Sequence, residues 1–201
     1  MKLYYAAGAC SLAPHIALSE AGIAAKTIPV DLKTHKLPDG SDFYAANPKG
    51  YVPMLELDDG TNLTEVAVLL QVIADKKPGT LAPAAGSIER YKLMEWLNFI
   101  ATELHKGFSP LWAPDTPDLT KQRAIAGIKR RLGLIDAQLA KTPFLTGSAF
   151  TIADAYLFTI VNWTNFMSMD ISEFKHVTAF MKRVAERPAV HAAMKAEGLV
   201  K

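Results

Sequence analysis

The chain has 201 residues, half of them hydrophobic and 21% charged, and its formal net charge is +2. This composition supports a sizeable core, argues against disorder, and gives no support for a nucleic-acid or anionic-membrane partner. A single cysteine excludes an internal disulfide and a zinc site built on several thiolates, and no apolar run approaches the ~20 residues of a membrane helix, so we expect a soluble, cytoplasmic protein in a reducing compartment.

The chain opens with a predicted strand, loop and helix. Leu3-Tyr4-Tyr5 is typical of a buried strand, and residues 6–9 are small enough for a tight loop that a ligand backbone can approach closely. A helix is predicted over residues 13–21, with Ser11 as its expected N-cap and Gly22 as the residue that ends it.

Cys10 lies just ahead of this helix N-terminus. The partial positive charge there favours the thiolate and lowers the pKa of a thiol, which makes Cys10 a candidate functional residue. The alternative interpretation is a small, inert, buried hydrophobe.

The rest of the first part alternates strands and helices. Residues 27–32 are predicted as a second strand, and Pro29 within it indicates an edge position. The elements that follow are a helical turn over 43–46, a strand over 51–57, a turn at 58–60, a short strand over 61–63 and a helix over 65–75. The predicted order is therefore β-α-β-(α)-β-β-α.

Residues 78–86 contain two proline–glycine clusters, and we place a domain boundary there, between residues 1–77 and 87–201. The second part has no strand signal, so the predicted fold class is α/β followed by all-α. Its helices are expected over 87–112 with a bend near Gly107, and over 118–140, 152–167, 173–186 and 189–196.

Two short stretches of the first part are candidate binding elements. A cis bond between Val52 and Pro53 would leave the Val52 N–H and C=O free to pair with an extended peptide, whereas an ordinary trans turn proline is the alternative and the commoner form. Glu65 and Val66 open a helix, so their amides form a candidate carboxylate site and the Glu65 side chain a candidate ammonium partner. Simple complementation of the helix dipole by Glu65 is the alternative.

Two further motifs lie in the helical part. Asn98, Thr102 and His105 are spaced i, i+4, i+7, which predicts one shared helical face, either a cleft wall or a solvated surface. Thr151 and Asp154 have the spacing of a capping box, which we interpret as structural.

Ordered matches along the whole chain make it similar to cytosolic glutathione transferases, most of all the bacterial beta class. The matching motifs are Lys2-Leu3-Tyr4-Tyr5, Gly8-Ala9-Cys10-Ser11-Leu12, Pro14-His15-Ile16, Asn47-Pro48-Lys49-Gly50, Val52-Pro53, Leu63-Thr64-Glu65, Glu95-Trp96-Leu97-Asn98, His105-Lys106-Gly107, Thr151-Ile152-Ala153-Asp154-Ala155-Tyr156 and Arg187-Pro188.

The resemblance implies a thioredoxin-like N-terminal domain, an all-helical C-terminal domain, a homodimer and glutathione as co-substrate, without metal. It implies catalytic roles for Cys10 and His105. First-strand Tyr4 and Tyr5 are weaker candidates, because other classes of the family use a tyrosine there. The glutathione-binding residues that it implies are Cys10, His35, Tyr51, Val52, Pro53, Glu65, Val66, Asn98, Thr102 and His105, and the electrophile pocket that it implies contains Lys106, Phe108, Trp112, Trp163 and Phe166.

The implied function is conjugation of the glutathione thiolate to small hydrophobic electrophiles, with thiol–disulfide exchange through Cys10. The chain departs from the beta-class pattern at Tyr51, Val66, His35 and Phe166, where Gln, Gly or Ser, Lys and His respectively are found in the class or in some of its members. Two other functions stay open. One is a noncatalytic ligand-binding or interaction protein on the same fold, and the other is a monothiol glutathione-dependent oxidoreductase.

Overall fold

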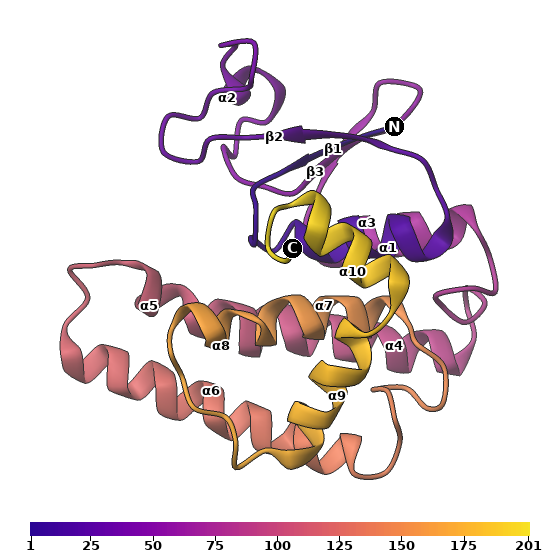
Figure 1. Cartoon of the computed structure of the whole chain (residues 1–201). Coiled ribbons are helices and arrows are strands. Elements are labelled where there is room, and N and C mark those ends of the chain that lie inside the picture. The colour runs from indigo at the N-terminus through magenta and orange to yellow at the C-terminus, as the bar shows by residue number, and fades with distance from the viewer. The chain divides into compact units, whose positions relative to one another are not determined.

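The computed structural model describes residues 1–201 and divides into two compact units, one of residues 1–82 with 186–201 and one of residues 83–185. The sequence predicts a helical domain over all of residues 87–201. The structure differs for the last segment, because α10 (Pro188–Ala196) packs on α1 (Leu12–Ala21) in the first unit (Figure 1). None of the helices combines the length and apolar character required to cross a membrane.

The first unit contains a four-stranded sheet in the order β2-β1-β3-β4. Its strands are β1 (Lys2–Tyr5), β2 (Lys26–Pro29), β3 (Met54–Glu56) and β4 (Asn62–Thr64). β1 pairs parallel with β2 and antiparallel with β3, and β3 pairs antiparallel with β4. The predicted edge position of Pro29 is confirmed, because β2 ends the sheet.

Helices cover the sheet in the predicted order. α2 (Phe43–Ala46) forms one turn, and α3 (Val66–Lys76) follows β4 and packs against α1. Eight of the ten residues of α1 are buried, which explains its apolar sequence. Gly22 adopts φ +63° and donates its N–H to the Leu18 and Ser19 carbonyls, so the predicted end of this helix is confirmed.

The predicted capping role of Ser11 is wrong. Its backbone is already helical, and its side chain makes no capping hydrogen bond. The hydroxyl instead accepts from the Ala6 N–H at 3.1 Å and donates to the Ala6 carbonyl at 3.2 Å. Ser11 therefore closes the β1–α1 loop on itself, and this loop carries Cys10.

The second unit is helical. Its elements are α4 (Ile88–Phe99), the π-helical segment η1 (Ile100–His105), the 3₁₀ segment η2 (Lys106–Phe108), α5 (Ser109–Trp112), α6 (Asp118–Leu139), α7 (Ile152–Val161), α8 (Trp163–Phe166) and α9 (Lys175–Ala185). The helix expected over residues 87–112 thus changes its winding twice before Ser109, and the one expected over 152–167 is interrupted at Asn162.

Every residue of α7 is buried, and its first turn is fixed by Asp154. The Thr151 N–H and hydroxyl both donate to Asp154 Oδ2 at 2.8 Å, and the Leu145 N–H donates to Oδ1 at 2.9 Å. Burial raises the pKa of Asp154 to about 6, although the hydrogen bonds act in the opposite direction. The predicted structural capping box is confirmed.

Candidate functional site

Cys10 and Val52, which are 42 residues apart in the chain, meet in the first unit. The Cys10 Sγ lies 3.4 Å from the Val52 carbonyl oxygen, and the Val52–Pro53 peptide bond is cis. Cys10 is partly buried and lies two residues before Leu12, the first residue of α1, where the Leu12 and Ala13 N–H groups donate to the Ala9 and Cys10 carbonyls. The Cys10 thiol therefore lies between the N-terminus of α1 and the backbone segment that leads into β3.

Glu65 forms the second cluster of this unit. Its Oε1 accepts from Lys49 Nζ at 2.7 Å and from the Tyr51 hydroxyl at 2.8 Å, and the hydrogen bond to Glu65 raises the pKa of Tyr51. Glu65 also has φ +72°, a backbone conformation that costs about 1–3 kcal/mol in a non-glycine residue and is frequent at functional sites. It directly precedes Val66, the first residue of α3, so the side chain and the helix N-terminus face the same surroundings.

His35 lies in the loop after β2 and is held by Tyr44. The Tyr44 hydroxyl is 3.3 Å from His35 Nε2 and the ring centroids are 4.5 Å apart, while the buried His35 Nδ1 has no hydrogen-bond partner. Gly50 supports this arrangement, because a Cβ there would stand 2.3 Å from the Tyr44 ring. Like Glu65, His35 is a non-glycine residue with a positive φ, here +53°.

The loop before Cys10 is also held by Glu197, just after α10. Glu197 Oε2 accepts from the Gly8 N–H at 3.0 Å, and its Oε1 lies 2.9 Å from His15 Nδ1. The carboxylate is completely buried. Arg187 adds a second link between α10 and α1, with a two-fold ion pair to Glu20 at 2.6 and 2.7 Å.

The first-strand tyrosines have structural surroundings. Tyr4 is buried, stacks on Phe43 and donates its hydroxyl to Glu56 Oε2 at 3.0 Å. Tyr5 packs its ring near His15. Both observations favour strand packing, the alternative to a catalytic role.

In the second unit, His105 belongs to a cluster of aromatic rings. Its Nδ1 lies 2.7 Å from the Tyr156 hydroxyl oxygen, and its ring meets Trp163 edge-on at 4.9 Å. Trp163 also makes edge-on contacts with Phe108 at 5.6 Å and with Trp112 at 5.3 Å. Trp163 thus contacts two other residues expected for an electrophile pocket, whereas Phe166 is half exposed and makes no ring contact with them.

Asn98, Thr102 and His105 do not form the single face that their spacing predicted. Asn98 and Thr102 are exposed, and the Thr102 hydroxyl donates to the Asn98 carbonyl at 3.0 Å. His105 turns instead onto Tyr156 and Trp163. The prediction assumed α-helical rotation, but η1 is a π-helix, whose wider turns displace every later residue around the axis.

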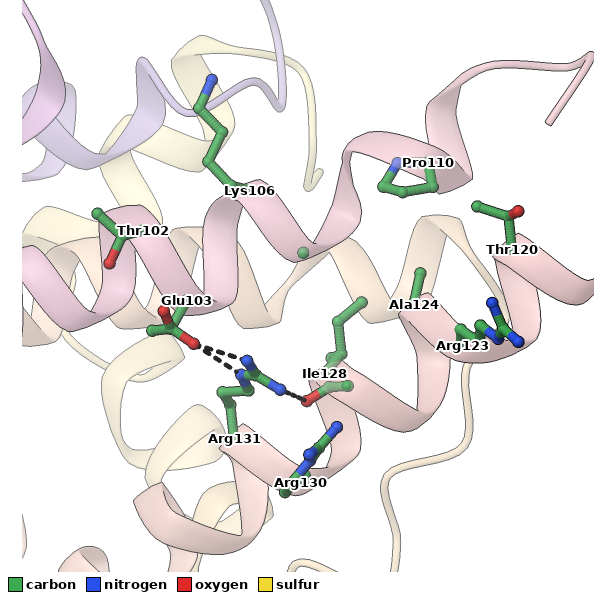
Figure 2. Close-up of a pocket in the computed structure, with 12 residues that line it drawn as sticks. Thr102, Glu103, Lys106, Pro110, Thr120, Arg123, Ala124, Ile128, Arg130 and Arg131 are labelled. Carbon is green, nitrogen blue, oxygen red and sulfur yellow. Dashed lines mark hydrogen bonds and ion pairs between the residues drawn. The ribbon is translucent and has the colours of Figure 1, made fainter.

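An open groove of about 470 Å³ runs between η1–η2 and α6 (Figure 2). Thr102 and Lys106 line it, but the rings of the aromatic cluster do not. Arg131 crosses it and donates to Glu103 at 2.6 Å and to the Gly127 carbonyl at 3.2 Å, and Figure 2 shows Lys106 extending away from α6.

Family models match two stretches of the chain. The model of the glutathione S-transferase N-terminal domain matches residues 7–76, and that of the C-terminal domain matches residues 99–188. Glutathione S-transferase GstA of Escherichia coli O157:H7 is 49% identical over 99% of this chain and 100% of its own length. The chain belongs to the glutathione S-transferase family.

Solved structures connect this transferase to the bacterial beta class. A beta-class glutathione S-transferase of Sphingomonas chungbukensis has a TM-score of 0.96 and 46% identity, with both chains fully covered. A sphingomonad glutathione S-transferase complexed with glutathione has the same TM-score and 45% identity, again over both full chains. The predicted family and fold class, a thioredoxin-like part followed by a helical part, are confirmed.

Several residues that support the site of this transferase were not predicted from its sequence. Lys49, Tyr156 and Glu197 were not assigned roles. Tyr156 is the one phenol in the largely apolar, buried α7, and this was a usable signal, because a buried phenol needs a hydrogen-bond partner. No spacing signal connects Glu197 to Gly8, 189 residues earlier.

Proposed function

We propose that this protein activates the thiol of glutathione and conjugates the resulting thiolate to small hydrophobic electrophiles, and that Cys10 also exchanges disulfides with glutathione. The observation that carries the proposal is the Cys10 Sγ at 3.4 Å from the Val52 carbonyl, directly before the N-terminus of α1. An extended cysteinyl segment that pairs with the Val52 backbone would bring its own sulfur beside Cys10.

The two ends of glutathione need charged partners, and the first unit offers them. The γ-glutamyl carboxylate fits the Val66 N–H at the start of α3, and its ammonium group fits the Glu65 carboxylate, which Lys49 and Tyr51 hold in place. The glycine carboxylate is assigned to the loop of His35. From the helical unit the family resemblance assigns Asn98, Thr102 and His105 to the same ligand, and the proposal depends on His105, because the π-helical winding of η1 separates it from the exposed Asn98 and Thr102.

Conjugation needs a thiolate at neutral pH. The helix N-terminus and a hydrogen bond from Cys10 stabilise the negative charge on the glutathione sulfur, and His105 is the proposed second donor. The thiolate then attacks the electrophilic carbon, a carbon–sulfur bond forms, and the leaving group departs with the electron pair of its bond. Phe108, Trp112 and Trp163 are the proposed apolar wall for the electrophile.

Disulfide exchange uses Cys10 as the nucleophile. Its thiolate attacks a glutathione disulfide, forms a mixed disulfide and releases one thiolate, and a second glutathione thiolate then attacks the glutathione sulfur and frees Cys10. Because the chain has a single cysteine, no internal thiol can resolve this intermediate.

Assays of conjugation to a chloronitrobenzene and of exchange with a small glutathione mixed disulfide test the proposal. Cys10→Ala removes both the sulfur and the donor, whereas Cys10→Ser keeps a donor and serves as the matched variant. We expect both variants to lose exchange, Cys10→Ser to keep most of the conjugation, and Cys10→Ala to keep less of it. Intact mass after exposure of the wild type to oxidised glutathione should show one adduct.

Other outcomes would select the other functions. Exchange without conjugation in the wild type would identify a monothiol oxidoreductase. Glutathione binding with neither activity would identify a noncatalytic binding protein. An adduct that forms only after denaturation would mean that Cys10 is inert, and the proposal would be wrong.

We also infer that two copies of the chain associate. Ile88 and Tyr91 on α4 and Val68 on α3 are large apolar side chains that stay exposed in the isolated chain. Analytical ultracentrifugation should give twice the chain mass, and Tyr91→Glu should shift the equilibrium towards the monomer. A wild type that sediments as a monomer at micromolar concentration would contradict the inference.

A further inference from the structure

The proposed donor His105 makes a short contact with Tyr156. The Tyr156 hydroxyl oxygen lies 2.7 Å from His105 Nδ1, and Tyr156 itself is 2% exposed. We propose that Tyr156 is a positioning residue, which donates its hydroxyl proton to His105 Nδ1 and thereby leaves the proton of the neutral imidazole on Nε2. The catalytic consequence of this inference rests on the proposed function, whereas the hydrogen bond and the tautomer do not.

The direction of the hydrogen bond follows from the two groups. A neutral imidazole has one protonated nitrogen and one acceptor nitrogen, and the partner of one nitrogen decides which is which. A phenol O–H is a better donor than an imidazole N–H, and an imidazole nitrogen is a better acceptor than a phenol oxygen. The 2.7 Å contact is therefore best satisfied with the proton on the Tyr156 oxygen.

The surroundings hold the His105 ring in this orientation. Tyr156 meets it edge-on at 5.9 Å and Trp163 does so at 4.9 Å, so rings from α7 and from α8 flank it. Tyr156 cannot follow a movement of His105, because every residue of α7 is buried and Asp154 fixes the start of that helix.

The backbone of His105 is adapted to this contact. His105 ends the π-helical segment η1, and the buried side chains of Leu104 and Phe108 anchor the chain on either side of it. π-helical turns are rare and frequently occur at functional sites. Here the π-helix has a definable effect, since it turns His105 inward to Tyr156 while Thr102 remains exposed.

The consequence for the proposed reaction is a fixed N–H donor. With Nδ1 accepting from Tyr156, neutral His105 presents Nε2–H, which can donate to a thiolate sulfur. With the opposite tautomer, Nε2 would present a lone pair to the sulfur and repel it. Loss of the Tyr156 hydroxyl should therefore affect turnover more than it affects the binding of glutathione.

Nitrogen NMR of the wild type tests the tautomer directly. The protein is labelled at histidine, the His105 signals are identified by their absence in His105→Ala, and spectra are recorded at a pH at which the ring is neutral. We expect the proton on Nε2 in the wild type and a shift of the Nδ1 signal in Tyr156→Phe. A proton on Nδ1 in the wild type would overturn the proposal, whatever the enzyme does.

A double-mutant cycle tests whether Tyr156 acts through His105. Tyr156→Phe should lower kcat at least about fivefold with KM for glutathione within about twofold, and it should change kcat by less than about twofold in a His105→Ala background. Thr159→Val is the matched control, because it also removes a buried hydroxyl from α7, one that donates to the Ala155 carbonyl. It should leave kcat unchanged.

Two outcomes of the cycle are informative. Equal losses from Tyr156→Phe in both backgrounds, or equal losses from Thr159→Val, would mean that Tyr156 is merely structural and would overturn the positioning role. If the wild type neither binds nor turns over glutathione, the proposed function fails, and the NMR experiment alone still decides the tautomer.

Discussion

The buried carboxylate of Glu197 should be one of the most sensitive positions of the first unit. It is the shared acceptor for the Gly8 N–H and for His15, and it joins the segment after α10 to the loop that carries Cys10. We consider two substitutions. Glu197→Ala removes both acceptor atoms, whereas Glu197→Gln keeps the shape and one oxygen.

The magnitude follows from the groups that are left without partners. In Glu197→Ala the Gly8 N–H and His15 Nδ1 lose their partner in a buried site, and each such loss costs about 1–3 kcal/mol. With the lost packing we expect the free energy of unfolding to fall by about 3–5 kcal/mol, the range found when one partner of a buried pair is removed. For a chain of this length that corresponds to a melting temperature lower by roughly 6–20 °C.

Glu197→Gln should behave differently. Its amide oxygen can accept from the Gly8 N–H, and its NH₂ group can donate to His15 Nδ1 when that nitrogen carries no proton. Both contacts then survive without the charge, and the loss should stay below about 1.5 kcal/mol. Glu186→Ala is the control, because Glu186 is exposed near the start of the same segment and its removal should change stability by less than about 0.5 kcal/mol.

Urea unfolding of the four proteins gives the stabilities, and the rate at which a small disulfide reagent modifies Cys10 reports on the loop. We expect Glu197→Ala to raise that rate, because Gly8 lies two residues before the thiol. The reasoning is refuted if Glu197→Ala loses less than about 1 kcal/mol, or if Glu197→Gln is as damaging as Glu197→Ala.

Two further predictions concern charge. Burial raises the pKa of Asp154 to about 6 from 3.8, so the folded protein keeps the carboxyl proton in a pH range in which the unfolded chain has lost it. The free energy of unfolding should therefore fall by up to about 3 kcal/mol as pH rises from about 4 to about 7. Asp154→Asn should flatten that part of the stability profile, and an unchanged slope would refute the assignment. His35→Lys places a full positive charge in the loop proposed for the glycine carboxylate, and calorimetry at pH 8 should show several-fold tighter glutathione binding. Lys33→Met is the control for general loop charge, and an effect of Lys33→Met alone would move the contact to that residue.

Local signals in the sequence were sufficient for most of the element order. The one-turn helix at Phe43–Ala46 and the turn at residues 58–60 were predicted at their observed positions, because Asp42, Asp58, Asp59 and Gly60 have strong local conformational preferences. Capping at Thr151 was likewise visible, since its partner Asp154 lies three residues away. These features need no knowledge of the remainder of the chain.

Interactions between distant residues were beyond the reach of such signals. Serine is a common N-cap residue, but the closed loop brings the Ala6 N–H and C=O close to the Ser11 hydroxyl, which bonds to them instead. Glu197 lies in the short segment after α10, which has no periodic sequence pattern, and its burial is explained by the packing of α10 on α1. The family resemblance named Cys10, Val52 and Glu65, but it did not name the residues that hold them.

The π-helical turn at η1 shows why the helical spacing misled the interpretation of His105. Seven residues after Asn98, an α-helix would return His105 to the same exposed face, and the sequence contains no glycine or proline between them to indicate otherwise. The irregular winding is compensated by a tertiary contact, because it lets His105 reach the Tyr156 hydroxyl while the neighbouring Leu104 stays buried. The α-helical winding is interrupted at His105, the residue proposed to donate to the glutathione thiolate. Because helix propensity alone would have continued the α-helix, we infer that the site sets the winding there and that the local sequence does not.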